Sequence, residues 1–110
     1  TLAYGDLKRF ELAVALANNP RLMLMDEPTA GMAPKERVEL MALTAEIVKE
    51  RNLSVLFTEH DMDVVFAHAD RILVLNRGEL IADDTPDNVR NNVEVKAIYL
   101  GSETEEIAHA

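Results

Sequence analysis

The amino-acid sequence predicts an α/β fold in which helices flank a layered sheet. Two short, mainly apolar runs, at 22–25 and 53–57, are typical of buried strands, and the segments around them show helical periodicity. Strands that alternate with helices favour α/β layers. Of the 110 residues 48% are hydrophobic and only 5% aromatic, so we expect an aliphatic core.

A first helix is expected from Asp6 to about Asn18. Four apolar side chains recur there at the spacing of one helix face: Leu7, Phe10, Val14 and Ala17. Residues 2–5 are interpreted as a loop. The helix is expected to end before Pro20, because a residue that precedes proline disfavours the helical conformation. This point is also the only candidate boundary along the chain.

The next strand is expected over Arg21–Asp26, buried on both faces because its apolar run is uninterrupted. A loop containing Gly31 then leads to a second helix, from Lys35 to about Glu50, which Asn52 ends. The apolar stripe of this helix comprises Leu40, Leu43 and Ile47, widened by Val38, Met41 and Val48.

The rest of the chain predicts a second strand, a short helix, a hairpin and two more helices. The strand spans Leu53–Thr58 and the short helix Met62–Ala69. The residues Asn76-Arg77-Gly78 are a hairpin signal between the segments 71–75 and 79–82. Thr85 is expected to cap a helix that has proline at its first position. Residues 95–100 are expected to be helical, Gly101 to close that helix, and the Glu-rich end to form a solvated tail.

Both predicted strands end in polar side chains. Asp26 and Glu27 follow the first strand, and Glu59-His60-Asp61 follows the second. If the strands are parallel neighbours, these ends meet on one edge of the sheet, where ligands of open α/β sheets bind. A phosphate-handling site needs one carboxylate to hold a metal and one to act on water. A histidine there could donate a hydrogen bond to a phosphate oxygen.

Other interpretations of these residues remain open at this point. An acidic pair after a strand is often only the start of a loop or a helix cap, and a single histidine is often a plain polar residue. His60 and Asp61 could also be ligands of a metal-dependent hydrolase. That reading requires further histidines, and only His68, expected within a helix, and His109, expected in the tail, remain.

Charge and composition narrow the function classes. The chain has 20 acidic and 11 basic residues, a net charge of −9, which disfavours nucleic acid and anionic lipid as general partners. It has no cysteine, which excludes disulfides, zinc–thiolate sites and thiol nucleophiles within it. It contains neither a membrane-spanning apolar run nor a signal-peptide pattern, so we expect a soluble intracellular protein. Because it begins at Thr1 without an initiator Met, we expect a fragment.

Four motifs in a fixed order resemble the second half of an ATP-binding cassette (ABC) ATPase. They are Leu2–Asp6 before a helix, the strand leading to Asp26-Glu27-Pro28, Ala30-Gly31-Met32, and Thr58–Asp61 after the next strand. The resemblance runs from Thr1 to about Gly101 and implies a partial P-loop NTPase sheet of the RecA-like, ABC type, its N-terminal half lying outside these residues. Within the family, 4–6, 26–32, 59–62 and 98–101 are most similar to the ATPase subunits of branched-chain amino acid importers.

The resemblance assigns roles at the two strand ends. Asp26 would hold Mg²⁺ through water, and Glu27 would be the general base that polarises the attacking water. His60 would be the switch histidine at the γ-phosphate. The implied cofactors are therefore ATP and Mg²⁺, and the implied reaction is phosphoryl transfer to water.

The resemblance also implies contacts across a dimer. Ala3, Tyr4, Gly5 and Asp6 match the signature motif, which binds the ATP of the opposite subunit, and Ala30-Gly31-Met32 matches the D-loop at the dimer interface. The signature usually has Ser, Gly and Gln where Ala3, Tyr4 and Asp6 stand, and we interpret the difference as variation within the importer subfamily. The implied domains are 1–19, the signature and end of the helical subdomain, and 20–110, the C-terminal part of the catalytic core with an acidic tail.

The expected function is that of an ATP-hydrolysing subunit of a branched-chain amino acid importer. It would lie on the cytoplasmic face of the membrane and pair with a second ATPase subunit, identical or not, and with permease subunits, without binding nucleic acid. The alternatives are an ABC ATPase of DNA repair or chromosome structure, and a non-catalytic interaction remnant.

No phosphate-binding GxxxxGK[ST] loop occurs in these residues, since none of the four glycines precedes a lysine. We therefore expect the isolated chain to bind ATP weakly or not at all, to be inactive, and to expose strand edges and apolar surface.

Overall fold

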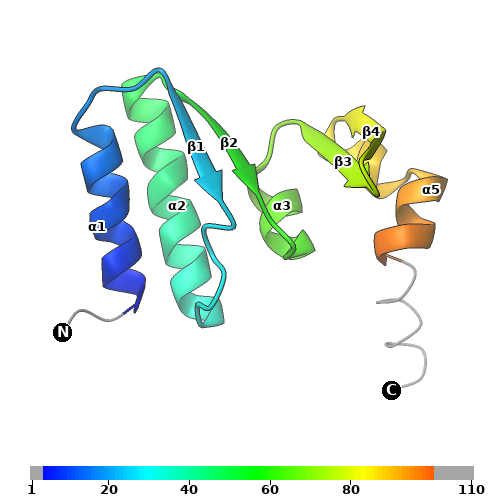
Figure 1. Ribbon diagram of the computed structural model, residues 1–110, viewed down its shortest axis with the longest axis horizontal. Helices are drawn as coiled ribbons and strands as arrows, with labels where there is room; N and C mark the ends of the chain where they lie inside the picture. Colours follow the sequence, from blue (N-terminus) through cyan, green and yellow to red (C-terminus); the bar gives the residue numbers. More distant parts are fainter. Residues whose placement is uncertain (1–3, 101–110) are drawn as a thin grey trace. The chain divides into compact units, whose positions relative to one another are not determined.

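The computed structural model describes the backbone of residues 4–100 and the side chains of residues 5–99. Its elements, drawn in Figure 1, are α1 (Tyr4–Leu16), β1 (Leu22–Asp26), α2 (Pro34–Arg51), β2 (Ser54–Thr58), α3 (Met62–His68), β3 (Ile72–Asn76), β4 (Glu79–Asp84), α4 (Pro86–Arg90), α5 (Val93–Val95) and a π-helical turn, Lys96–Leu100. The chain forms two compact units, one ending at His68 and the other beginning at Ala69.

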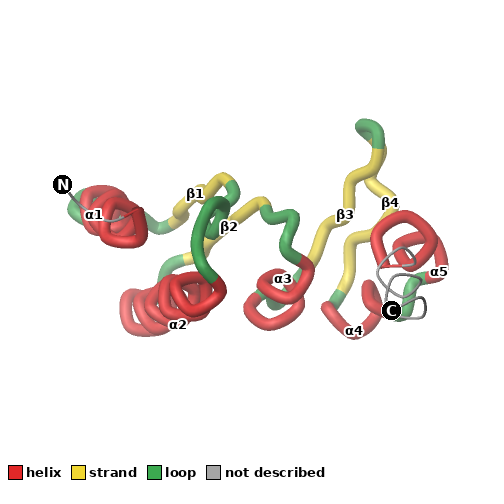
Figure 2. Tube along the Cα trace, turned by 90° about the horizontal axis from the view of Figure 1, so that it is seen from below, coloured by secondary structure: helices red, strands yellow, loops and turns green. Residues whose placement is uncertain are grey.

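The first unit contains a two-stranded parallel sheet. β1 and β2 pair from Leu22 with Ser54 to Asp26 with Thr58, so their carboxyl ends are in register. Helix α2 connects the two strands and α1 lies beside it (Figures 1 and 2). The two strands are therefore parallel neighbours, which is the condition under which their polar ends meet on one edge.

The core of this unit is aliphatic, as predicted, but α1 turns a different face to it. Six side chains form the buried cluster: Leu12, Leu16, Met23, Met32, Leu40 and Leu53. The predicted stripe of α1 is wrong, since Leu7, Phe10 and Val14 are 40%, 60% and 54% exposed and Ala17 lies outside the helix and exposed. The helix has apolar residues on two sides, and the side that carries Leu12 and Leu16 packs against α2 and β1.

Strand β1 is buried on one face only, so the expectation of burial on both faces is wrong. Met23 is buried, whereas Leu22 and Leu24 are 55% and 72% exposed. Successive side chains of a strand point to opposite faces, and α1 and α2 cover only the face that carries Met23. Leu56 of β2 is exposed as well, in keeping with the expected exposure of apolar surface.

Helix boundaries agree with the sequence signals at α2 and differ at α1. Pro34 opens α2, and Asn52 closes it in a left-handed conformation with φ of 51°, as predicted. Helix α1 begins at Tyr4, so the loop assigned to Tyr4 and Gly5 is wrong; the assignment to Leu2 and Ala3 lies outside the described residues. Asp6 therefore lies in the first turn, where a carboxylate is favourable toward the helix dipole.

The second unit contains the predicted hairpin. Arg77 and Gly78 between β3 and β4 both have positive φ, 50° and 79°, as a type I′ turn requires. Thr85 caps α4 as predicted, accepting a hydrogen bond of 3.3 Å from Asn88 N. The helix expected at residues 95–100 is observed as the end of α5 and the π-helical turn; the expectations for Gly101 and the tail lie outside the described residues.

No helix within residues 4–100 combines the length and apolar character needed to cross a lipid bilayer.

Candidate functional site

The carboxyl ends of β1 and β2 bring the predicted polar residues together. The Thr58 hydroxyl donates a hydrogen bond of 2.7 Å to Asp26 Oδ1. The backbone N–H of Glu27 donates to both the hydroxyl and the carbonyl oxygen of Thr58, at 3.0 Å each. These bonds fix the start of the chain that leaves β1 against the last residue of β2.

Glu27 turns the chain sharply at this point. Its φ of 44° lies in the left-handed region, which side chains other than glycine and asparagine rarely adopt. Its Oε1 lies 2.5 Å from His60 Nε2. The His60 side chain is otherwise open, with 90% of its surface exposed, and that of Glu27 is 39% exposed. The carboxylate and imidazole thus touch each other while both remain accessible to a ligand.

Asp26 has the chemistry of a magnesium ligand. One of its carboxylate oxygens accepts the Thr58 hydrogen bond, and no hydrogen bond within residues 4–100 engages the other. Mg²⁺ keeps several water ligands and binds proteins through one or two carboxylates together with substrate phosphates. A single exposed carboxylate beside an accessible Glu and His therefore fits such an ion.

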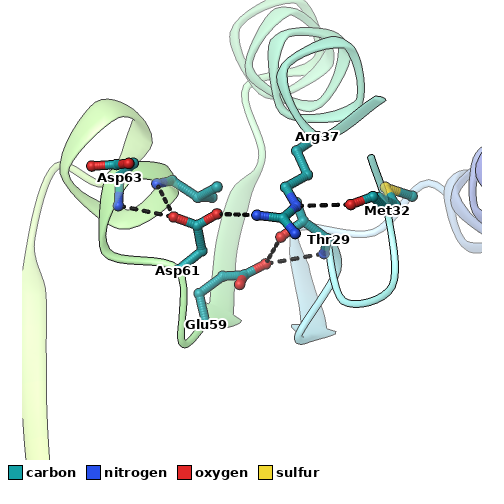
Figure 3. A network of polar contacts seen from close by, with 7 residues as sticks. Thr29, Met32, Arg37, Glu59, Asp61 and Asp63 are labelled. Atoms are coloured by element: carbon teal, nitrogen blue, oxygen red, sulfur yellow. Dashed lines mark hydrogen bonds and ion pairs between the residues drawn. The ribbon is translucent and has the colours of Figure 1, made fainter. Parts of the chain in front are cut away.

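A second set of polar contacts holds the two residues that flank His60 (Figure 3). Glu59 Oε1 accepts hydrogen bonds from Thr29 N at 3.0 Å and from Thr29 Oγ1 at 2.6 Å. Arg37 Nη1 donates to Asp61 Oδ2 at 2.7 Å, and Arg37 Nε donates to the carbonyl oxygen of Met32 at 3.0 Å. Asp61 Oδ1 accepts from Asp63 N at 3.0 Å and Val64 N at 3.4 Å and so caps α3.

These contacts bear on the alternative of a metal-dependent hydrolase. Both carboxylate oxygens of Asp61 already accept hydrogen bonds. Within the part of the chain that the structure describes, no group of three acidic, His or Cys side chains could hold a metal ion. His109 lies outside that part. The geometry therefore favours Asp61 as a structural partner of Arg37 and not as a metal ligand.

The residues predicted for the dimer contacts lie in two places. Gly5 and Asp6 are in the first turn of α1, where a Cβ on Gly5 would lie 2.9 Å from Glu36 Oε2 of α2. Asp6 lies 3.6 Å from Arg9, which also contacts Glu39. No hydrogen bond or ion pair of the described residues joins Gly5 or Asp6 to Glu27 or His60. Ala3 is outside the described residues, as is the side chain of Tyr4.

The loop of Ala30, Gly31 and Met32 presents only part of itself to solvent. Met32 is buried in the core at 4% exposure, while Ala30 and Gly31 are exposed. The loop is held by hydrogen bonds from Ala30 N to Glu27 O, 3.1 Å, and from Met32 N to Thr29 O, 3.2 Å. A partner could therefore reach the first two residues, and Met32 anchors the loop.

The sequence interpretation missed Thr29, Arg37 and Thr58 as participants in the site. Thr58 could have been found from the register, because the last residues of two parallel neighbours lie side by side. Arg37 lies 24 residues before its partner Asp61, and no local pattern relates the two.

Comparison with known proteins finds relatives that are ATP-binding proteins of transporters. The high-affinity branched-chain amino acid transport ATP-binding protein BraF of Pseudomonas aeruginosa is 46% identical over 101 residues, which are 92% of this chain and 40% of BraF. Its counterpart LivG of Escherichia coli K12 is 45% identical over 100 residues, 91% of this chain and 39% of LivG. No family model matches the chain.

Solved structures agree with these relatives. The ADP conformation of MJ1267, an ATP-binding cassette of an ABC transporter, superposes with a TM-score of 0.79 at 33% identity, covering 91% of this chain and 41% of MJ1267. The resemblance to ABC transporter ATP-binding proteins and the fold class are therefore confirmed. The chain spans about 40% of the length of the curated relatives it matches.

Proposed function

We propose that this relative of ABC transporter ATP-binding proteins supplies the hydrolytic carboxylate and histidine of an ATPase that drives the import of branched-chain amino acids. The observation that carries the proposal is the 2.5 Å contact between Glu27 and His60, beside Asp26, at the shared ends of two parallel strands. The names of BraF and LivG support the transported class.

Phosphoryl transfer to water requires the protein mainly to position the reacting groups and to neutralise charge. Glu27 Oε1 can accept a proton from a water molecule, and its contact with His60 holds the carboxylate at one position. When ATP is bound, the His60 Nε2–H could donate to a phosphate oxygen in place of Glu27. Asp26 would hold Mg²⁺, which neutralises phosphate charge when ATP is bound. Glu27 has a left-handed backbone, with φ of 44°, and its side chain contacts His60.

The proposed partners follow from the same family. Gly5 and Asp6, with Ala3 and Tyr4, would contact the ATP of a second ATPase subunit, and Ala30 and Gly31 would lie at the interface with it. Closure of this dimer on ATP would drive membrane permease subunits, and the protein would then lie at the cytoplasmic face of the membrane. Asp6 would bring negative charge toward the phosphates, and Arg9, 3.6 Å away, offsets part of it.

The test is Glu27→Gln in the complete gene product, assembled with its permease subunits. Loss of the general base is expected to lower ATP hydrolysis at least about 100-fold while ATP binding persists. Glu50→Gln, which changes an exposed carboxylate near the end of α2, is the matched control and is expected to leave hydrolysis unchanged. Unchanged hydrolysis in the Glu27→Gln protein would contradict the assignment of the base.

Two measurements distinguish a transporter from other ABC ATPases: the uptake of amino acids, and the stimulation of ATP hydrolysis by DNA or by the permease. The assembled protein is expected to take up radiolabelled leucine, isoleucine or valine in an ATP-dependent manner. An ATPase activity stimulated by DNA and indifferent to the permease would contradict transport. An intact assembly that binds no ATP would point to a non-catalytic module.

A further inference from the structure

The turn that carries His60 is held from both sides. Glu59 accepts two hydrogen bonds from Thr29, and Asp61 accepts one from Arg37. Thr29 and Arg37 bracket the loop of Ala30, Gly31 and Met32. We call Thr29, Arg37, Glu59 and Asp61 the polar clamp. Because its contacts come before and after His60 in sequence, they fix the position of the intervening backbone.

His60 depends on this backbone for its place. Its side chain is 90% exposed, and its contact with Glu27 is the only polar contact found for it among the described residues. An exposed side chain gains little from packing, so the position of its Cα is set by the contacts that hold its backbone. By contrast, Thr29 is 2% exposed, and the side chains of Arg37 and Asp61 are 36% and 25% exposed. The clamp is thus more buried than the residue it surrounds.

Arg37 joins the two sides of the site through one guanidinium. Its Nε holds the Met32 carbonyl at 3.0 Å, and its Nη1 holds Asp61 at 2.7 Å (Figure 3). Asp61 in turn caps α3 with its other oxygen. The planar guanidinium fixes the angle between its donors, so a shift of Met32 is transmitted to Asp61.

We propose that Arg37 is a positioning residue that couples the loop of Ala30, Gly31 and Met32 to His60, so that a partner pressing on the loop changes the placement of His60 against Glu27. The inference rests on the proposed ATPase function for its catalytic consequence. The mechanical coupling itself depends only on the clamp contacts.

The variants separate the contacts of Arg37. Arg37→Ala removes both of them, and Arg37→Lys can restore only one, because an ammonium cannot span both partners as the fork does. Asp61→Asn removes the charged partner but keeps an oxygen that can cap α3. The matched control is Arg51→Ala, since Arg51 of the same helix also donates to a backbone carbonyl, that of Leu16 at the end of α1, at 3.3 Å and away from the site.

The first measurement is steady-state ATP hydrolysis by the assembled complete protein. Misplacement of a catalytic group by about 1 Å can cost 100-fold, so we expect Arg37→Ala to lower kcat at least about tenfold with KM for ATP within about twofold. Arg37→Lys is expected to fall between it and the wild type. The double variant with Asp61→Asn should lose little more than either single variant. A kcat no lower than that of Arg51→Ala would overturn the catalytic consequence.

The second measurement does not require activity. In amide hydrogen exchange, Arg37→Ala is expected to accelerate exchange in residues 59–64 together with 29–33, whereas Arg51→Ala should affect only the ends of α1 and α2. Acceleration confined to 29–37 would overturn the coupling. If Glu27→Gln leaves hydrolysis unchanged while exchange at 59–64 responds to Arg37→Ala, the proposed function fails and the coupling stands.

Discussion

The Thr58 hydroxyl lies 2.7 Å from Asp26 Oδ1, so the last residue of β2 holds the carboxylate at the end of β1. The same hydroxyl accepts the backbone N–H of Glu27 at 3.0 Å. One side chain therefore holds both the carboxylate of Asp26 and the backbone of Glu27. This follows from the in-register pairing of the two strands, which places Thr58 directly beside Asp26.

Thr58→Val is expected to disturb the site with little change of shape. Valine fills the same space but cannot donate to Asp26 or accept from Glu27 N. We expect lower ATP hydrolysis in the complete protein and a loss of about 1 kcal/mol in the free energy of unfolding. Thr58→Ser, which keeps the hydroxyl, is the control for hydrolysis rates and urea unfolding. Equal hydrolysis in both variants would show that these two hydrogen bonds of the hydroxyl do not matter for hydrolysis.

The face that α1 buries is open to a direct stability test. Leu12→Ala removes a side chain that is 6% exposed and should lower the free energy of unfolding by about 2–5 kcal/mol. Phe10→Ala removes a larger side chain that is 60% exposed and should change it by no more than about 0.5 kcal/mol. Urea unfolding of both variants compares the two faces, and a larger loss for Phe10→Ala would reverse the assignment.

The sequence predicted the structure correctly at positions where a single local signal determines the backbone conformation. Asn52, Thr85 and the Arg77-Gly78 turn each act on their own backbone, and all three are observed as predicted. The meeting of Asp26 and His60 at one edge followed from the alternation of strands and helices. The buried face of α1 could not be chosen, because apolar residues on both of its sides satisfy the helical spacing, and only tertiary packing selects Leu12 and Leu16.

The contacts of the polar clamp could not be predicted from the sequence, because they too depend on tertiary structure. Thr29 and Glu59 are 30 residues apart, and their contact exists only because β1 and β2 are in register. The pattern of charged residues along one helix or strand does not predict a contact with a residue of another element. The carboxylates and the histidine could be predicted from their residue types and their positions after the strands. The residues that hold them in place became evident only from the three-dimensional structure.

Stability of the hairpin unit is expected to depend on acid pH through Asp83. Arg71 donates hydrogen bonds of 2.6 Å to both carboxylate oxygens of Asp83, which lowers the pKa of this carboxyl below its ordinary value. A group whose pKa is lower in the folded state stabilises above its unfolded pKa, about 3.9 for Asp, and loses this contribution as pH falls through the folded pKa. Asn88 and Thr85 lower the pKa of Asp84 in the same direction.

Arg71→Gln tests this dependence. Its thermal midpoint should lie below that of the wild type at pH 7. The difference should shrink as pH falls from about 4 toward the lowered folded pKa of Asp83, because over this range the unfolded wild-type chain binds the proton before the folded one does. It should also shrink in 1 M salt, because the pair is exposed and screened. A difference that stays constant down to pH 2 would show that the ion pair is not its cause.

Nucleotide binding by these 110 residues alone is expected to be weak. Asp26, Glu27 and His60 offer two negative charges and one imidazole, and the sequence contains no GxxxxGK[ST] loop whose N–H groups and lysine would cradle the phosphates. We expect a Kd for Mg-ATP weaker than about 1 mM, corresponding to less than about 4 kcal/mol of binding free energy. Isothermal titration calorimetry measures this directly, with Glu27→Gln as the comparison, since loss of one negative charge should tighten binding slightly if ATP contacts this site. A micromolar Kd would contradict the prediction and would mean that these residues contain a phosphate cradle of their own.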